Sequence, residues 1–298
     1  MRFCVVELEG RPDPVLGVER NGGIVPVPGP ASLRQALDLH GPDRLVQRAA
    51  EATAEPVAVS KVRRWLPPVP DPRNFRDAYA FEQHVKAARA RRGQDMIPEW
   101  YKMPIFYFSN TGSLRGHNEA VKKPASTSEL DFELEVACVM GKAVQDVSAA
   151  TAEDAIFGYA VLNDWSARDL QREEMKCMLG PAKGKDFATS LGPWVVTKDE
   201  LADKRVGPGK YDLVMTGRRN GKEISRSNFN TMYYDYTQII ERCSRDATLY
   251  PGDLIGSGTC GTGCILELGP EATGGWLMPG DVMEMEIERL GVLRTLIV

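Results

Sequence analysis

The stretch most informative about the fold reads Leu130-Asp131-Phe132-Glu133-Leu134-Glu135-Val136-Ala137-Cys138-Val139-Met140-Gly141, which is typical of a β-strand. Successive side chains of a strand point to opposite faces, so Asp131, Glu133 and Glu135 are expected on one face. The continuously apolar second half indicates burial, where neighbouring carboxylates repel one another. A hard divalent cation would offset this repulsion, and carboxylate-only ligation favours Mg²⁺, Mn²⁺ or Ca²⁺ over Zn²⁺.

A solvated acidic face is the alternative, and the chain contains a strand of that kind. Residues 282–288 also carry three acids at period two, but apolar and acidic residues alternate throughout, as in a half-exposed antiparallel strand. The earlier strand differs because its second half is apolar throughout. A second carboxylate, Asp164, also follows an apolar run, residues 159–162. Both features favour a metal site at the earlier strand.

The composition is that of an ordinary globular protein whose partners are small molecules or itself. A net charge of −4 gives no general attraction to nucleic acid or to an anionic membrane. We expect a cytoplasmic location, because the N-terminus does not resemble a signal peptide and no apolar run approaches ~18 residues. The six cysteines are scattered, and Cys260 and Cys264 lack partners at zinc-site spacing, which predicts reduced structural thiols.

Two domains are expected, a small N-terminal domain over residues 1–66 and a larger one over residues 67–298. The first contains a hairpin with its turn at residues 20–23 and two helices, over residues 32–40 and 43–53. The segment that follows has prolines at 67, 68, 70 and 72, which exclude regular structure.

The second domain carries several polar residues next to predicted elements. Residues 77–92 predict a helix, on which Asp77 and His84 would lie about 10 Å apart along the axis. A lone histidine on a basic helix is usually a surface residue, which is the alternative for His84. Arg168 and Gln171 are expected on one face of the next helix, and Lys185 in a glycine-containing basic turn.

The C-terminal third provides core elements and excludes one cofactor. Residues 230–245 show an apolar helical stripe that predicts core packing. Residues 256–261 match G-x-G-x-x-G, but residues 264–268 predict a strand, so no helix follows to bind a dinucleotide. The sequence shows no nucleophile elbow, H-E-x-x-H motif or P-loop either. A metal ion with a general base is the chemistry that remains.

Several segments together resemble the fumarylacetoacetate hydrolase family, over roughly residues 70 to 298. The resemblance implies an α+β, mostly β fold: a rolled mixed β-sandwich with a small N-terminal α/β domain, in a homodimer. The segments are Asp77-Ala78-Tyr79, Gln83-His84, Leu130-Asp131-Phe132-Glu133-Leu134-Glu135, Asn163-Asp164-Trp165-Ser166-Ala167-Arg168-Asp169-Leu170-Gln171, Gly184-Lys185 and Ser257-Gly258-Thr259.

The resemblance also implies roles for individual residues. A divalent metal, most readily Mg²⁺ with Mn²⁺ or Ca²⁺ as alternatives, would be held by Glu133, Glu135 and Asp164, with Asp77 as a fourth ligand. Two departures leave the far end of the pocket open: Met175 replaces a family tyrosine, and the arginine after His84 matches Arg89, Arg91 or Arg92. The residues implied to contact substrate or the departing enolate are Tyr79, Tyr107, Arg168, Gln171, Lys185 and Thr259.

These residues predict a metal-dependent hydrolase that cleaves a C–C bond in a 1,3-diketo acid: an acylpyruvate, fumarylpyruvate or a fumarylacetoacetate-like compound. The metal would polarise the carbonyl, His84 would deprotonate the attacking water, and Lys185 and Gln171 would stabilise the developing charge. Oxo-acid decarboxylases, isomerases and hydratases with the same metal site are the alternative enzymes. A non-catalytic metal-binding dimer is the alternative of a different class, although such a site would need neither His84 nor Lys185.

A histidine base needs an acceptor on its second nitrogen to fix the tautomer. In short members of the family that this chain resembles, a glutamate stands three residues after this histidine. In this chain that position is Ala87. Glu267 is the predicted partner, because it matches the family's glutamate. On a strand it would also point away from Leu266 and Leu268. An exposed strand glutamate is the alternative.

Overall fold

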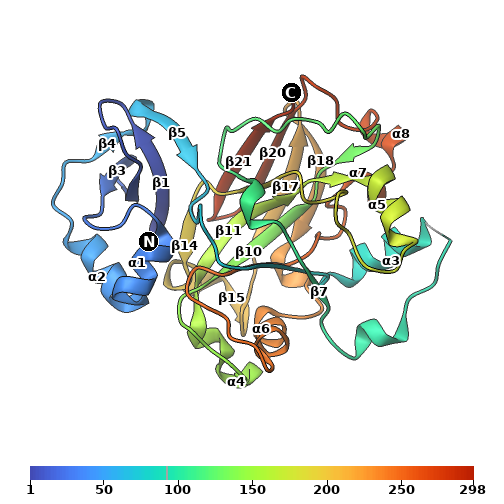
Figure 1. The fold of residues 1–298 in the computed structure, drawn as a ribbon, viewed down its shortest axis with the longest axis horizontal. Coiled ribbons are helices and arrows are strands. Elements are labelled where there is room, and N and C mark those ends of the chain that lie inside the picture. The colour runs from blue at the N-terminus through green and yellow to red at the C-terminus, as the bar shows by residue number, and fades with distance from the viewer. Residues whose placement is uncertain (92) are drawn as a thin grey trace.

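The computed structural model describes residues 1–91 and 93–298, and most of its strands belong to one mixed sheet (Figure 1). The strands are β1 (Arg2–Leu8), β2 (Val15–Arg20), β3 (Gly23–Pro26), β4 (Val57–Ala58), β5 (Val62–Leu66), β6 (Phe75–Ala78), β7 (Phe106–Phe108), β8 (Leu114–Arg115), β9 (Leu130–Asp131), β10 (Leu134–Met140), β11 (Ile156–Asp164), β12 (Ser166–Ala167), β13 (Thr189–Leu191), β14 (Val195–Thr197), β15 (Arg205–Gly207), β16 (Lys210–Tyr211), β17 (Val214–Arg219), β18 (Lys222–Asn228), β19 (Leu254–Gly256), β20 (Val282–Ile287) and β21 (Gly291–Leu296). The α-helices are α1 (Leu33–His40), α2 (Pro42–Glu51), α3 (Glu82–Ala90), α4 (Ala149–Ala152), α5 (Arg168–Met175), α6 (Tyr236–Ser244), α7 (Ile265–Leu268) and α8 (Pro270–Thr273). Short 3₁₀-helices cover Val59–Lys61, Pro98–Tyr101, Thr111–Ser113, Glu153–Ala155, Lys198–Lys204 and Phe229–Thr231.

The centre of the large sheet is the antiparallel pair β10 and β11, whose residues are all buried. On its other side β10 pairs with β19, which lies parallel to β6, and β6 in turn pairs with β7. The register places Gly256 of β19 opposite Asp77 of β6, and Asp77 opposite Tyr107 of β7. Strands that are far apart in the sequence therefore bring polar residues to one region of the sheet.

A second sheet, in the order β18-β17-β20-β21, covers one face of this centre (Figure 1). Leu134, Val136 and Cys138 pack into a core that includes Met215 and Met285 of that sheet. Fully burying a side chain such as Leu134 contributes about 1.5–3 kcal/mol. Two sheets around a shared core confirm the predicted mixed, mostly β fold. Strand β20 alternates between half-buried and buried residues, as predicted for residues 282–288.

The N-terminal residues form their own hairpin and helices, and they also extend the large sheet. The hairpin β2–β3 turns at Asn21 and Gly22, whose positive φ angles of 53° and 78° suit a two-residue hairpin turn. Ser32 caps α1 as expected, whereas α2 begins at Pro42, one residue before the predicted start. Because β1 pairs with β14, the first strand is continuous with the main sheet. The domain boundary after residue 66 stays a prediction.

The helix predicted over residues 230–245 begins only at Tyr236, as α6, and three other predicted elements differ further from the structure. The helix expected over residues 77–92 begins only at Glu82, because residues 75–78 pair with two distant strands as β6. The strand expected over residues 264–268 is the one-turn helix α7. The strand expected from Leu130 is interrupted at residues 132–133, between β9 and β10. Local propensity favoured each predicted element, and long-range pairing or side-chain bonds outweighed it.

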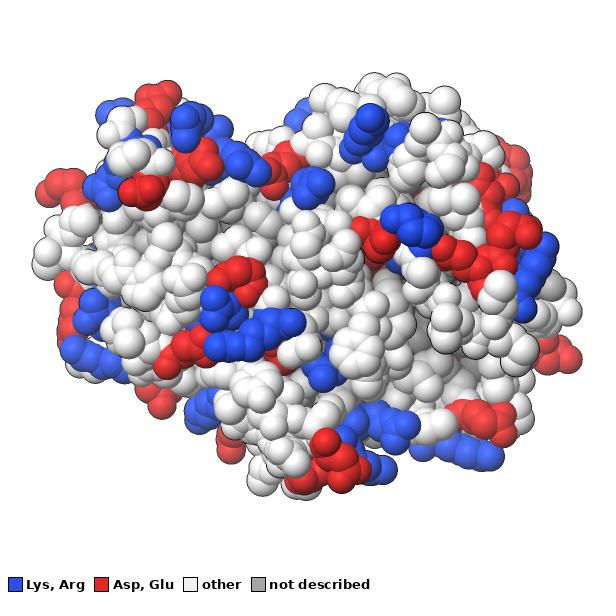
Figure 2. All heavy atoms as spheres, viewed as in Figure 1, with Lys and Arg blue, Asp and Glu red and all other residues white. Residues whose placement is uncertain are grey.

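The surface carries charges of both signs. On the face viewed in Figure 2, acidic and basic side chains are interspersed, and uncharged areas separate them. Among the described residues, none of the helices has both the length and the apolar character that crossing a bilayer requires.

Candidate metal and active site

Three buried carboxylates meet where the central strands lie side by side. Asp77 comes from β6, Glu135 from β10 and Asp164 from the end of β11. One oxygen of each lies within 4.8 Å of the other two, and the side chains are almost fully buried. These are three of the four predicted metal ligands, and the pairing of β10 with its neighbours explains how they meet.

The segment after β19 provides room and hydrogen bonds for this cluster. The backbone N–H of Gly258 donates to Asp77 Oδ1 at 3.2 Å and to Glu135 Oε2 at 3.0 Å. A Cβ on Gly256 would overlap the Asp77 carboxylate, and one on Gly258 would overlap the Ala78 carbonyl. The glycines of the G-x-G motif are therefore required for close packing against β6.

Ionisation of all three carboxylates is unfavourable without a cation, because they are buried and repel one another. Burial, followed by the charge of Asp164, raises the pKa of Asp77 well above its usual range. Burial and the charge of Asp77 have the same effect on the pKa of Glu135. Desolvated carboxylates that face one another are a good fit for a hard divalent ion, because oxygen ligands of this kind suit Mg²⁺, Mn²⁺ and Ca²⁺. Asp77, Glu135 and Asp164 could hold such an ion together.

Glu133, the fourth predicted ligand, lies outside this group among the described residues. Its carboxylate forms an ion pair with Lys185, and its Oε1 lies 2.8 Å from an Arg168 nitrogen. Burial opposes ionisation, but these two cations outweigh it and lower the pKa of Glu133 to about 2. Lys185 also donates to Asp164 Oδ2 at 2.6 Å, so it joins Glu133 to the cluster. The role of Glu133 as a ligand stays a prediction.

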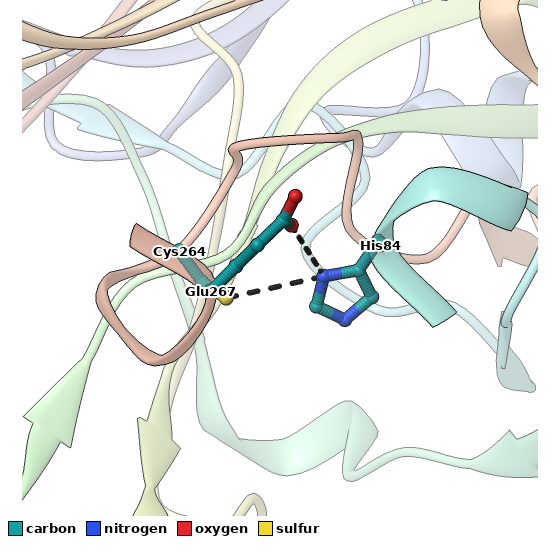
Figure 3. Close-up of side chains that lie close together, drawn as sticks. All are labelled: His84, Cys264 and Glu267. Atoms are coloured by element: carbon teal, nitrogen blue, oxygen red, sulfur yellow. Dashed lines mark hydrogen bonds and ion pairs between the residues drawn. The ribbon is translucent and has the colours of Figure 1, made fainter. Parts of the chain in front are cut away.

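His84 lies on α3 and contacts Glu267 of α7, the predicted partner (Figure 3). Its Nδ1 is 3.0 Å from Glu267 Oε2, while Glu267 Oε1 accepts a hydrogen bond of 2.8 Å from the Thr262 N–H. The two side chains are therefore in contact, with the glutamate on a helix and not on a strand, and their catalytic roles stay predictions. Cys264 Sγ lies 3.9 Å from the same His84 nitrogen.

Asp131 has a structural role that the sequence pattern did not reveal. Its carboxylate accepts from Arg168 Nε at 2.8 Å and from the backbone N–H groups of Ile265 and Leu266, at 2.7 and 3.0 Å. It thus holds Arg168 and the start of α7 in place. Arg168 in turn donates to Gln171 Oε1 at 3.1 Å, as expected for two residues on one helix face.

One cavity of about 420 Å³ connects these groups. Arg89, Ile105 and Met175 also line it, whereas Arg91 contacts the Glu267 carbonyl and Arg92 lies outside the described residues. Asp164 does not line the cavity itself, but it accepts a hydrogen bond from the hydroxyl of Tyr107, which does. The predicted site residues that line the cavity are Asp77, Tyr79, His84, Tyr107, Glu133, Glu135, Arg168, Gln171, Lys185 and Thr259.

The carboxylate cluster predicts how the metal-free protein responds to pH. Because the folded-state pKa of Glu135 is raised above its ordinary value of 4.5, the folded protein keeps a proton that the unfolded chain loses. This contribution to stability is present below pH 4.5 and is lost as pH rises through the raised pKa. Glu135→Gln cannot ionise and so avoids this loss at high pH, and we expect its melting temperature to be about 2 °C or more above wild type at pH 8.

Thermal unfolding in the presence of a chelator, at pH 4 and pH 8, measures this effect. The gain should be much smaller at pH 4, where the native carboxyl is already protonated. Glu284→Gln, on the half-exposed strand β20, is the matched control and should change neither value. Equal melting temperatures of wild type and Glu135→Gln at pH 8 would mean that the neighbouring carboxylates do not destabilise the metal-free fold.

Comparison with known proteins shows the same fold and related sequences. The chain is 32% identical over 259 residues to a fumarylacetoacetase of Arabidopsis thaliana, an alignment that covers 70% of this chain and only 61% of that protein. It is 31% identical over 302 residues to a mitochondrial oxaloacetate tautomerase of Bos taurus, covering 98% of this chain and 90% of that protein.

A solved structure agrees in fold over the whole chain. Maleylpyruvate hydrolase of Sphingobium sp. SYK-6, in complex with manganese(II) and pyruvate, superimposes with a TM-score of 0.74 at 22% identity, covering 100% of this chain and 99% of that chain. In addition, residues 73–298 match the model of the fumarylacetoacetate hydrolase C-terminal domain. This match covers most of the sequence and includes the carboxylate cluster, His84 and Glu267, so the chain belongs to the fumarylacetoacetate hydrolase family.

Proposed function

We propose that the protein is a metal-dependent hydrolase that cleaves a C–C bond in a 1,3-diketo acid such as an acylpyruvate. The observation that carries this proposal is one cavity lined both by Asp77 and Glu135 of the buried carboxylate cluster and by His84, which contacts Glu267. A relative named fumarylacetoacetase, and a maleylpyruvate hydrolase of the same fold solved with manganese(II) and pyruvate, support the same class of substrate.

Asp77, Glu135 and Asp164 would hold the divalent ion. When bound, the ion would polarise a carbonyl of the oxo acid and offset negative charge that develops on it. Lys185 lies next to Asp164 and is charged, because Asp164 and Glu133 raise its pKa despite burial. It can therefore donate a hydrogen bond to the same anionic end of the substrate.

His84 would act as the general base. The Glu267 carboxylate would accept a hydrogen bond from Nδ1–H, which leaves the ring nitrogen turned away from it, Nε2, free to accept a proton (Figure 3). Nε2 would take a proton from water as the oxygen bonds to the acyl carbon. The C–C bond then breaks, and the same proton passes to the departing enolate carbon. Arg168 and Gln171, at the cavity wall, would hold the anion during this step.

A tautomerase is the second candidate, because the related oxaloacetate tautomerase aligns with nearly the whole chain. The same His84 could move a proton between carbon and oxygen of an oxo acid without adding water. Decarboxylation or hydration of an oxo acid would use the same carboxylate cluster, whereas a metal-binding dimer without turnover would need neither His84 nor Lys185. The homodimer and the cytoplasmic location stay predictions.

The products distinguish hydrolysis from tautomerisation. With an acylpyruvate and Mg²⁺ in H₂¹⁸O, we expect pyruvate and a free carboxylic acid that carries one ¹⁸O atom, because water supplies the new oxygen. Mass spectrometry and a coupled pyruvate assay measure both. Rapid loss of enol absorbance from oxaloacetate, with no cleavage of any diketo acid, would favour the tautomerase instead. Release of CO₂ from oxaloacetate would favour the decarboxylase.

A further inference from the structure

His84, Cys264 and Glu267 form a second cluster of possible metal ligands (Figure 3). One atom from each, the imidazole Nδ1, the thiol Sγ and a carboxylate oxygen, lies within 4.8 Å of the others. All three side chains are buried or nearly so. Cys264 is the N-cap residue of the one-turn helix α7, and Glu267 lies within that turn, which brings the two side chains to the same end of the helix.

The separations are close to those that a tetrahedral zinc ion requires. At the tetrahedral angle, zinc–nitrogen and zinc–sulfur bonds of about 2.0 and 2.3 Å place the two ligand atoms about 3.5 Å apart, and nitrogen and oxygen bonds of about 2.0 Å place those atoms about 3.3 Å apart. In this structure the corresponding distances are 3.9 Å from Nδ1 to Sγ and 3.0 Å from Nδ1 to Glu267 Oε2. Shifts of a few tenths of an ångström would therefore suffice.

We propose that His84, Cys264 and Glu267 bind a borderline-soft divalent ion, Zn²⁺ being the type, at a second site separate from the carboxylate cluster. The two sites share no residue, and their ligands differ in kind. Nitrogen and sulfur donors favour zinc, whereas the all-oxygen cluster favours Mg²⁺, Mn²⁺ or Ca²⁺. Because His84 lines the cavity, the ion can enter from the same opening as the substrate.

Binding at this site inhibits the enzyme, a consequence that rests on the proposed function. An ion on Nδ1 forces the imidazole proton onto Nε2, so that nitrogen donates a hydrogen bond and no longer accepts a proton from water. The ion also displaces the thiol proton of Cys264, which leaves to solvent. Zinc at this site therefore removes the base, whichever metal the carboxylate cluster holds.

Cobalt(II) is the probe for binding, because its thiolate complexes have a charge-transfer band in the near ultraviolet. The parent protein for this test is the full chain with the substitution Cys177→Ser, which removes the exposed thiol. It is saturated with Mg²⁺ before titration with CoCl₂. We expect a band that saturates at one equivalent. Cys264→Ser should lack the band, and the matched control Cys260→Ser, a buried thiol four residues away, should keep it.

A band that survives in Cys264→Ser, or no band in the parent protein, would overturn the site. If Cys264→Ser unfolds at a lower temperature than Cys260→Ser, Cys264→Ala replaces it. In assays with excess Mg²⁺, Zn²⁺ should inhibit the parent at least about tenfold more strongly than Cys264→Ser. A cobalt band without zinc inhibition would overturn the inhibitory role alone. The spectrum does not depend on which reaction the enzyme catalyses, so failure of the proposed function remains distinguishable.

Discussion

Removal of the divalent ion is expected to abolish turnover of an acylpyruvate, with a loss of more than about 10³-fold. A metal ion that stabilises developing charge contributes several kcal/mol to the transition state, and about 1.4 kcal/mol corresponds to a tenfold change in rate. Without the ion, the carboxylates of Asp77 and Glu135 repel one another and the substrate anion. Dialysis against a chelator followed by steady-state assays measures the loss, and added Mg²⁺ or Mn²⁺ should restore the rate.

Single variants then assign the ligands. Glu135→Gln should weaken Mg²⁺ binding, measured by titration calorimetry, whereas Glu284→Gln on β20 should bind as wild type does. Glu133→Gln is the informative case: a ligand role predicts weakened binding, and a role as counter-ion to Lys185 predicts nearly unchanged binding with lower activity. Full turnover by the chelated wild-type protein would refute the metal assignment altogether.

The elements that the sequence predicted well are those whose pattern reflects local burial. Strand β11 and the apolar half of β10 are continuously apolar because both of their faces are covered. Strand β20 alternates because one face is half exposed. In these cases the period of the apolar residues directly reports the environment of each face.

The elements that the sequence pattern did not predict depend on partners far away in the chain. Asp77 opens a segment with the composition of a helix, residues 77–92, but its strand pairs with residues 254–256. Likewise, the period of two predicted that Glu133 lies beside Glu135. The strand is broken before β10, where the Glu133 N–H donates to the Asn163 side chain. The Glu133 carboxylate therefore lies next to Lys185 and Arg168. The contact between His84 and Glu267 spans 183 residues and was found through family resemblance, not local pattern.

Loss of the general base is expected to lower kcat by about 10³-fold, within the range that a positioned acid or base contributes. His84→Asn tests this, with His40→Asn at the end of α1 as the control far from the cavity. Because the imidazole is not among the carboxylate ligands, Mg²⁺ affinity should stay at the wild-type value. Wild-type kcat in His84→Asn would exclude a base at this position.

Glu267→Gln is a finer test of the same step, since it changes the tautomer of His84 without removing the ring. The Thr262 N–H donates to one oxygen of Glu267, so the amide of the variant must place its oxygen there and its NH₂ toward His84. That donor requires an acceptor at Nδ1, which moves the imidazole proton to Nε2, where a base needs a free lone pair. We therefore expect kcat to fall by about 10²-fold or more, with Mg²⁺ affinity unchanged. The ¹⁵N shifts of His84, one of only three histidines, should change from the Nδ1–H to the Nε2–H pattern. A purely structural role for Glu267 would leave that pattern unchanged, and wild-type kcat alongside a switched tautomer would show that His84 is not the base.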